Sequence, residues 1–370
     1  MALAADNPLA TAVLTVDLDA VQANYRLLKG ELGGLPTAAA VKGDAYGVGA
    51  VQASRAMANI GCEDFFVVSV EEGIEIKPVV GDGRIHVLYG AMPGSESALV
   101  EHGLTPVMNS LGDIERWAAE ANRLGRPLPC DLHFDTGMSR TGFPAAEADV
   151  LEAEPARLQG LEVDVVMSHL HSADAAGDAY SAGQLERFQD MRSRFAQGRA
   201  SFANSSGCFL GPGYRFDLGR PGIALYGGNP LATAANPMQG VIRLESRVLQ
   251  VREIAAGDVV GYSATFTASE TMRVATVPLG YADGYHRSLG NAGLTHIDGI
   301  PCPVLGRISM DLISIDVTAV PETQARAGAL VEVIGPHQDI EDVAVRAGTN
   351  SNEILTSLGA RYHRVYVGGQ

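Results

Sequence analysis

Thr37-Ala-Ala-Ala-Val-Lys42-Gly-Asp-Ala-Tyr46-Gly-Val-Gly49 is the stretch of sequence that decides the fold. Alanine and valine pack readily in the middle of a sheet, so the pattern predicts a strand that ends at Lys42. Parallel α/β folds place their chemistry at this end of their strands. A lysine in apolar surroundings has a lowered pKa and can attack carbonyl groups, which is Schiff-base chemistry with pyridoxal phosphate as the usual aldehyde. The alternative is a strand-end lysine that reaches solvent.

Predicted strands alternate with predicted helices over the first two thirds of the chain, and Asp17 can cap the first helix. Eight candidate strands in this arrangement favour a (β/α)8 TIM-type barrel, with a doubly wound sheet as the alternative. The candidate strands are Thr37–Val41, Asp64–Val70, Arg84–Tyr89, Pro106–Met108, Asp131–Phe134, Val163–Ser168, Ser201–Ala203 and Gly222–Tyr226.

The pattern changes after about Pro237. Short apolar runs separated by Gly, Pro and Asp predict a mainly-β C-terminal domain, with helices only near the end. We therefore expect a barrel over residues 12–236 and a β-rich domain over 237–370, with the first residues, up to about 11, packing with the latter. The predicted C-terminal elements are strands Val241–Glu253, Asp258–Tyr262, Met272–Pro278, Leu294–Ile297, Cys302–Leu305, Leu312–Val317 and Leu330–Ile334, and helices Glu341–Ala347 and Ser351–Leu358.

Composition narrows the range of partners. The 370 residues are 46% hydrophobic and 19% charged, which is typical of a globular protein. The net charge of -16 argues against nucleic acid and anionic membranes as partners. The four cysteines are far apart and form no metal-binding motif, which favours reduced thiols in a cytoplasmic protein over a disulfide. We expect no signal peptide and no membrane span.

The lysine segment resembles a motif of the alanine racemase family, in which small residues precede Lys-Ala-Asn/Asp-Ala-Tyr-Gly-His-Gly. The resemblance extends from Val16 to Tyr366, with several motifs in the same order, although Val48 stands where the family usually has His. It implies a barrel that binds pyridoxal phosphate through a Schiff base on Lys42, followed by a β domain. It also implies a head-to-tail homodimer whose active sites include residues of the partner's β domain.

A second motif contains His133-Phe-Asp135-Thr-Gly-Met138-Ser-Arg140. Arg140 could bind a substrate carboxylate through two parallel hydrogen bonds, or it could be a surface arginine after a capping aspartate. The resemblance implies that Arg140 contacts the cofactor's phenolic oxygen and the substrate carboxylate. Many family members carry an anionic, carbamylated lysine where this chain has His133. Our hypothesis is that another anion, such as chloride, or an altered hydrogen-bond network compensates.

His169 stands at the end of another predicted strand, and Asp174 follows five residues later in the sequence. A strand-end histidine is often satisfied by local hydrogen bonds. The resemblance instead implies that His169 lies against the pyridine ring and that Asp174 lies near the substrate entrance. It gives no role to His171.

Two late segments predict the phosphate site. Asn204-Ser205 and Gly222-Ile223 offer hydroxyl and backbone donors in late βα loops, where barrels often bind phosphate, although ordinary turns have similar sequences. The resemblance implies that these four residues and Tyr46 belong to the cofactor site, with Ser205, Gly222, Ile223 and Tyr46 holding the phosphate.

The resemblance also implies that Arg220 faces the pyridine nitrogen of the cofactor. A guanidinium donates hydrogen bonds and effectively never gives up its proton, so the nitrogen opposite it stays unprotonated. The ring is then a weaker electron sink, which favours simple proton removal and return over side reactions such as transamination.

The β domain contributes Gly280-Tyr281-Ala-Asp283-Gly284, which would otherwise be taken as a tight turn. The resemblance implies that Tyr281 is the acid/base opposite Lys42, and that Met310 and Asp311 complete the substrate site. Relatives often carry a phosphate-binding tyrosine near the C-terminus, and Tyr362 is a candidate substitute here.

The motifs together predict an alanine racemase that moves a proton between the two faces of Cα, with Lys42 and Tyr281 as bases, and that supplies D-alanine for peptidoglycan. A racemase of broader specificity, for serine or basic amino acids, remains open. A barrel-type decarboxylase or a non-catalytic cofactor-homeostasis module fits less well, because the former should carry a glycine triplet and a catalytic cysteine and the latter should lack the β domain. No metal is expected.

Overall fold

The computed structural model describes residues 9–174, 179–232 and 234–370, which form two compact units. The β unit contains the residues up to Ala20, Tyr226–Gly228 and Gln239–Gly368, and the barrel unit contains Val21–Leu225, Asn229–Met238 and Gly369–Gln370. Helix α1 (Leu18–Glu31) begins in the first and continues in the second.

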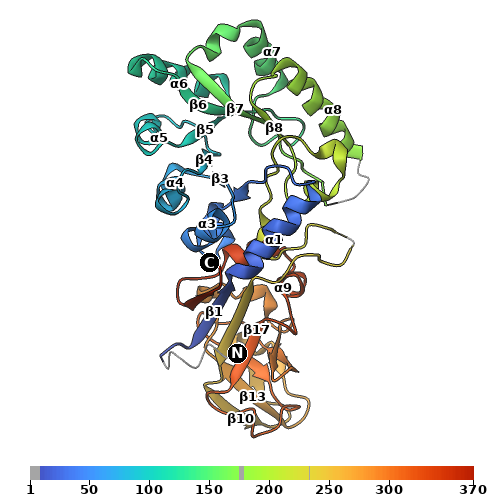
Figure 1. Cartoon of the computed structure of the whole chain (residues 1–370). Coiled ribbons are helices and arrows are strands. Elements are labelled where there is room, and N and C mark those ends of the chain that lie inside the picture. The colour runs from blue at the N-terminus through green and yellow to red at the C-terminus, as the bar shows by residue number, and fades with distance from the viewer. Residues whose placement is uncertain (1–8, 175–178, 233) are drawn as a thin grey trace. The chain divides into compact units, whose positions relative to one another are not determined.

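Within the described residues, the barrel unit contains a parallel sheet of seven strands in the order β2 to β8. Helices α3 to α8 lie along its outer side (Figure 1). The strands are β2 (Ala39–Ala40), β3 (Asp64–Val67), β4 (Arg84–Val87), β5 (Thr105–Met108), β6 (Leu128–His133), β7 (Leu161–Met167) and β8 (Arg199–Ser201). The helices are α2 (Lys42–Tyr46), α3 (Ala50–Ala58), α4 (Val70–Ile76), α5 (Glu96–His102), α6 (Leu111–Leu124), α7 (Ala145–Ala153) and α8 (Ala179–Arg194).

An irregular segment, residues 217–221, closes the barrel between β8 and β2. On one side the N–H of Leu218 donates to Ala200 (3.1 Å), and on the other the N–H of Ala38 donates to Gly219 (2.8 Å). The predicted eighth strand, Gly222–Tyr226, is wrong, because its residues form the 3₁₀ helix η6 (Ile223–Tyr226). Pro221 has no N–H to donate, which keeps the closing segment irregular. The predicted barrel fold is nevertheless confirmed.

Small and branched side chains fill the barrel interior, as the alanine-rich strand before Lys42 predicts. They pack against Phe66 and Met167 in one cluster, and each residue of the cluster is almost fully buried. The cluster consists of Ala38, Ala40, Phe66, Val107, Val165, Met167 and Leu218.

Local signals explain several helix ends. The carboxylate of Asp17 accepts a hydrogen bond from the N–H of Ala20 (2.9 Å), which confirms the predicted cap of α1. Ser110 caps α6 through the N–H of Asp113, and the helix ends at Gly125, whose φ of 64° is left-handed.

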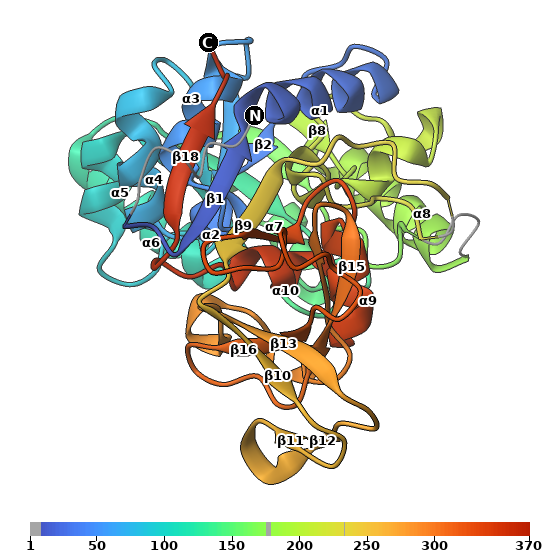
Figure 2. The same ribbon diagram turned by 90° about the horizontal axis from the view of Figure 1, so that it is seen from below.

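The β unit contains a sheet of nine strands, within the described residues, in the order β10-β13-β16-β15-β14-β17-β9-β1-β18. Strand β1 pairs in parallel with β18 and antiparallel with β9 (Figure 2). Residues 12–17 therefore lie in the β unit, whereas the sequence analysis assigns them to the barrel. The pairing with C-terminal strands has no local sequence signal.

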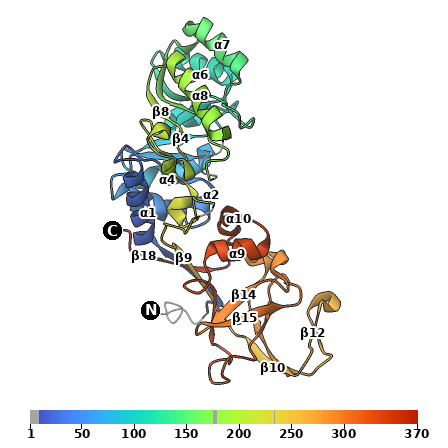
Figure 3. The ribbon, with the colours of Figure 1, turned by 90° about the vertical axis from the view of Figure 1, so that its right-hand side faces the viewer.

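Many C-terminal elements match their predicted positions. Leu294–Ile297 and Leu330–Ile334 are strands as predicted, and the run Val241–Glu253 divides into two. Helices α9 and α10 pack together (Figure 3). The elements are β1 (Ala12–Asp17), β9 (Ile242–Arg247), β10 (Gln250–Ile254), β11 (Val259–Val260), β12 (Phe266–Thr267), β13 (Met272–Val277), β14 (Leu294–Ile297), β15 (Ile300–Leu305), β16 (Ile313–Asp316), β17 (Leu330–Ile334), α9 (Ile340–Ala347), α10 (Ser351–Thr356) and β18 (His363–Val367). No helix in the described ranges is long and apolar enough to cross a membrane.

Candidate active site

Lys42 lies two residues after the end of β2, at the carboxyl end of the barrel strands, and a left-handed turn follows it. The backbone φ angles of Asp44, Ala45 and Tyr46 are 55°, 51° and 56°, a conformation that costs L residues about 1 kcal/mol or more each. Such a run persists only where its surroundings hold it in place.

Two carboxylates hold this turn. Glu72 accepts hydrogen bonds from the N–H groups of Gly43 (2.8 Å) and Val68 (2.7 Å), and Asp44 accepts one from Ala50 (2.7 Å). The two carboxylates therefore hold the backbone that follows the lysine.

The surroundings of Lys42 favour its neutral, nucleophilic form. Burial and the positive charge of Arg140 lower its pKa, Glu72 acts in the opposite direction, and Arg220 lowers it further. A lysine of this kind suits Schiff-base chemistry.

Asp135 shapes the turn that carries Arg140. Its carboxylate accepts backbone hydrogen bonds from Gly137 (2.9 Å), Met138 (2.9 Å) and Ser139 (3.0 Å). Arg140 is exposed, and the hydrogen bonds and ion pairs of the described residues do not include it. Its charge is felt by Lys42 and His169, so it belongs to the cationic group at the end of the barrel.

Arg220 is buried in the barrel, on the segment that closes it. It donates hydrogen bonds to the hydroxyl of Ser201 and to the carbonyl of Ser168 (2.6 Å), and its guanidinium lies 5.8 Å from the centre of the Phe66 ring. Burial lowers its pKa to about 10, so it remains a cation at neutral pH.

Both histidines of the site are neutral. Burial, followed by the charges of Arg220 and Arg140, lowers the pKa of His169 well below its usual value. Burial and Arg220 lower the pKa of His133 to about 3, although Asp135 opposes the shift. His133 Nδ1 is 2.8 Å from the side-chain oxygen of Asn109.

The predicted phosphate residues come together where the barrel closes. The hydroxyl of Ser205 accepts hydrogen bonds from the N–H groups of Gly222 (2.9 Å) and Ala224 (3.3 Å), at the start of η6. A Cβ atom at Gly222 would lie 2.2 Å from the hydroxyl oxygen of Tyr46. The hydroxyls of Ser205 and Tyr46 thus meet the backbone of Gly222, where a side chain would not fit, and such a tight turn of polar groups fits a phosphate beside it. Ile223 is the next residue of this turn.

Asn204 supports this turn locally. Its side chain accepts a hydrogen bond from the N–H of Gly207 (2.9 Å) and donates one to the carbonyl of Leu170 (3.3 Å).

In the β unit, Tyr281 lies on a short turn next to the segment that contains Met310. The N–H of Tyr281 donates to Ser309 (3.1 Å), and the N–H of Ala282 donates to Met310 (3.0 Å). The side chains of Tyr281 and Met310 are 45% and 53% exposed. The structure thus brings Tyr281 together with Met310 and Asp311, as the motifs imply.

Arg361 joins these two segments, a role that the sequence analysis missed. Its guanidinium donates to both oxygens of Asp283 (2.6 and 2.7 Å) and to Asp311 (2.6 Å). The partners are 50 and 78 residues away in the chain, so no spacing rule could have found them.

Tyr362 is buried inside the β unit, beside Leu244, Tyr285 and Leu358. Burial raises its pKa. Its contact with a phosphate stays a prediction. His171 is exposed and bonded to its neighbour Ser172, and the side chain of Asp174 is exposed.

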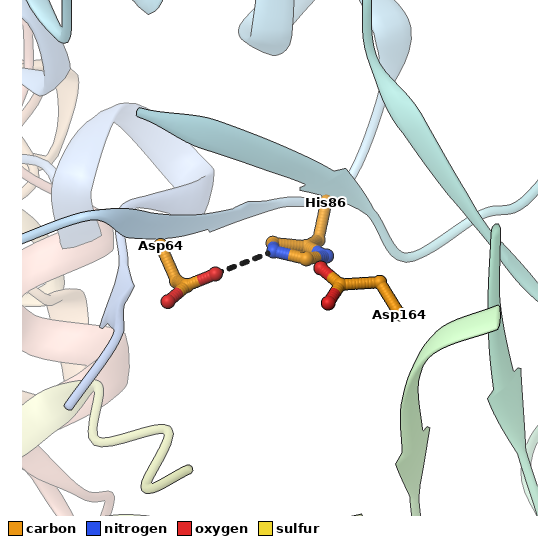
Figure 4. Close-up of side chains that lie close together, drawn as sticks. All are labelled: Asp64, His86 and Asp164. Carbon is orange, nitrogen blue, oxygen red and sulfur yellow. Dashed lines mark hydrogen bonds and ion pairs between the residues drawn. The ribbon is translucent and has the colours of Figure 1, made fainter. Parts of the chain in front are cut away.

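A second charged cluster lies on the strands of the barrel sheet, and Figure 4 shows three of its members. Asp64, His86 and Asp164 are close enough to hold a metal ion. However, Arg199 donates to both carboxylates at 2.8 Å, and Arg84 donates to Asp64 at 2.8 Å. Arginines already supply the positive charge, so the cluster is an ion-pair network.

A barrel with a partly buried lysine near a strand end, a tight turn that fits a phosphate and a β-rich unit in the same chain are the features of a pyridoxal-phosphate barrel enzyme. Family models for the N-terminal and C-terminal domains of alanine racemase match residues 16–230 and 241–366. The chain belongs to the alanine racemase family, whose members are pyridoxal-phosphate-dependent isomerases.

Individual relatives agree with this assignment. An alanine racemase of Rhodospirillum rubrum is 46% identical over 97% of this chain and 96% of its own length. A catabolic alanine racemase of Agrobacterium fabrum is 44% identical over 97% and 92% of the two chains. The crystal structure of a Bartonella henselae alanine racemase with covalently bound pyridoxal phosphate is 38% identical, with a TM-score of 0.93 over 97% of this chain and all of that one.

Proposed function

We propose that this protein interconverts L- and D-alanine with Lys42 of one subunit and Tyr281 of the partner subunit as its two bases. The observation that carries the proposal is that two separate structural elements each present a proton-transfer group: Lys42 on its left-handed turn and Tyr281 on its exposed turn. Racemisation requires removal of a proton from one face of Cα and delivery to the other, so it needs two such groups.

The residues of the barrel unit have distinct proposed tasks. Tyr46, Ser205, Gly222 and Ile223 hold the phosphate, with Asn204 fixing the loop, and His169 packs as a neutral ring against the pyridine. Arg140 binds the carboxylate of the amino acid. When bound, pyridoxal phosphate supplies the electron sink that makes the Cα proton acidic.

Arg220 tunes this electron sink. Because its pKa stays at about 10, the guanidinium keeps its protons and can only donate a hydrogen bond to a ring nitrogen that it faces. A moderate sink favours rapid return of the proton over transamination.

The remaining residues belong to the substrate side. Lys42 takes or gives the proton on one face of Cα, and Tyr281 of the partner subunit does so on the other. Met310 and Asp311 limit the space beside the substrate. Tyr362 is retained as a candidate phosphate contact.

We also propose a cytoplasmic head-to-tail homodimer that supplies D-alanine for peptidoglycan. The family assignment supports this reading. The sequence identity does not separate a biosynthetic from a catabolic role, because a relative named catabolic is 44% identical to this chain and one without that label is 46% identical. Racemisation of serine or basic amino acids is the alternative.

Chiral analysis of products tests the substrate. The purified protein with pyridoxal phosphate is given L-alanine, L-serine and L-lysine in parallel. We expect D-alanine to form much faster than the other D-amino acids. Faster racemisation of serine or lysine would show that this amino acid, and not alanine, is the preferred substrate. Release of carbon dioxide without a D product would show that the protein is a decarboxylase and not a racemase.

Two variants test the bases. Lys42→Ala should abolish turnover, because it removes both the cofactor attachment and one base. Tyr281→Phe should mainly remove proton abstraction from L-alanine, measured by loss of label from [2-²H]-L-alanine compared with the D isomer. Normal racemisation by Lys42→Ala would refute the assignment.

A further inference from the structure

Three segments that are distant in sequence meet in the β unit. Tyr281 lies in the first, between Gly280 and Gly284, and Met310 lies in the second. The segments are so close that a Cβ atom at Gly280 would lie 2.2 Å from the carbonyl oxygen of Met310. The third segment contains Ser357, whose carbonyl oxygen would lie 1.8 Å from a Cβ atom at Gly284.

Asp283 organises the turn of Tyr281 from within. One oxygen of its buried carboxylate accepts a hydrogen bond from the N–H of Gly280 (2.8 Å), and Gly284 closes the turn with a φ of 92°. The backbone carbonyl of Asp283 also accepts a hydrogen bond from Gly359 (2.9 Å), on the third segment.

A single guanidinium connects all three segments. Nε and one terminal nitrogen of Arg361 bind the two oxygens of Asp283, and the other terminal nitrogen binds Asp311. The arrangement uses the planar, forked geometry of arginine, which the single ammonium group of lysine cannot reproduce.

This contact is better suited to positioning than to stability. The ion pair between Arg361 (49% exposed) and Asp311 (55% exposed) contributes little to folding, whereas the carboxylate of Asp283 (8% exposed) requires only a nearby positive charge, which lysine also supplies. In contrast, small displacements of a catalytic group are costly in rate. The main effect of this three-way contact is therefore to fix the positions of the three segments relative to one another.

We propose that Arg361 is a positioning residue that fixes the turn of Tyr281 against the Met310–Asp311 segment. Proton transfer and substrate contact then depend on one side chain that touches neither the substrate nor the cofactor. The proposal rests on the role of Tyr281 proposed above.

The test compares Arg361→Lys and Arg361→Gln with wild type and with Arg123→Lys, all as cofactor-loaded protein. Arg123 is a matched control, because it makes a similar two-bond contact with Glu120 (2.7 and 2.6 Å) in the barrel unit. We expect kcat/KM for alanine to fall roughly 10- to 100-fold in both Arg361 variants and to stay unchanged in Arg123→Lys. The melting temperature should stay close to wild type in Arg361→Lys, which keeps a positive charge beside Asp283, and should fall in Arg361→Gln, which leaves this buried carboxylate without its cation.

Isotope effects separate positioning from a loss of folded protein. With [2-²H]-L-alanine, abstraction by Tyr281 should become more rate-limiting, so the isotope effect should rise in the Arg361 variants, without a matching rise for [2-²H]-D-alanine. A smaller fraction of active protein would lower the rate and leave both isotope effects unchanged. That outcome, or wild-type kinetics in Arg361→Lys, would overturn the proposal.

Hydrogen exchange gives a readout that does not depend on turnover. The amides of Tyr281 and Ala282 donate to the second segment, so a peptide containing them should exchange faster in Arg361→Gln and not in Arg123→Lys. Unchanged exchange would contradict the proposal. If Tyr281→Phe racemises normally while exchange still changes, the assignment of the base fails and the positioning contact stands.

Discussion

Gly222 is a position where one methyl group should decide cofactor binding. Its substitution by alanine would place Cβ 2.2 Å from the Tyr46 hydroxyl oxygen and 3.4 Å from the Cβ atom of Ala40. One of these neighbours must then move, and overpacking in a closed site is costly. We expect Gly222→Ala to weaken pyridoxal phosphate binding by about tenfold or more, measured by titration of cofactor absorbance.

A double variant checks the cause. Tyr46→Phe removes the clashing oxygen and leaves only the ring carbon, 2.9 Å from the new Cβ, so Gly222→Ala combined with Tyr46→Phe should bind the cofactor better than the two single effects predict. Gly213→Ala is the control, because the nearest atom to its new Cβ is 3.9 Å away. Strictly additive losses would show that the hydroxyl oxygen of Tyr46 is not the cause.

The sequence motifs named the candidate site residues, but they did not predict what surrounds them. Lys42 and Arg220 have recognisable neighbours in the chain. Asn109 does not, although its amide nitrogen donates to the carbonyls of Leu88 (3.1 Å) and Val107 (2.9 Å) and so turns its oxygen toward His133. This contact supports the altered hydrogen-bond network over the chloride version of our hypothesis.

At the scale of elements, three barrel strands share one buried imidazole. His86 on β4 lies 2.7 Å from the carboxylate of Asp131 on β6 and 3.1 Å from that of Asp64 on β3. Burial alone would lower the pKa of His86, but the charges and hydrogen bonds of the two carboxylates raise it to about 9. Burial raises the pKa of Asp131, so this buried pair retains its proton.

Stability should therefore decrease in alkaline solution. The folded-state pKa of His86 is above the unfolded value of about 6.5, so its contribution is fully present below that pH and is lost as the pH rises through about 9. We expect His86→Gln to cost about 3–5 kcal/mol near neutral pH, because it leaves a buried carboxylate without its cation. The melting temperature from pH 6 to 10 measures both effects.

Two comparisons make this test specific. His102→Gln changes a histidine outside the network and should leave the pH profile unchanged. Adding Asp131→Asn to His86→Gln should recover part of the stability, since it removes the unpaired charge. An equally steep alkaline loss in wild type and His86→Gln would contradict the role of His86.

Elements with a strong local pattern were predictable, and those defined by distant partners were not. The strand before Lys42 and the strand Leu330–Ile334 follow from apolar runs bounded by turn residues. Strand β1 joins the β unit only through β9 and β18, and the barrel closes through an irregular segment that contains Pro221. Both depend on pairings that short-range patterns do not encode.

At the scale of the whole molecule, the proposed dimer makes a quantitative prediction. If each active site combines Lys42 of one subunit with Tyr281 of the partner subunit, Lys42→Ala and Tyr281→Ala protomers can form mixed dimers with one intact site. Two inactive proteins, mixed and allowed to exchange subunits, should regain about a quarter of wild-type activity. Racemase assays after mixing measure this.

Each variant alone, taken through the same exchange procedure, is the control. Recovery that depends on total protein concentration would further support assembly in solution. If the mixture stays inactive although mass spectrometry shows mixed dimers, both bases must come from one subunit.

The segment 217–221 has a consequence for how the protein is made. It completes the barrel, and it also carries Arg220 and precedes Gly222. A ribosome releases β2 and Lys42 long before it releases this segment, and the turn that fits the phosphate does not exist until the two ends of the sheet meet. A nascent chain should therefore be unable to bind the cofactor. Cofactor binding should occur only after the whole barrel has been synthesised.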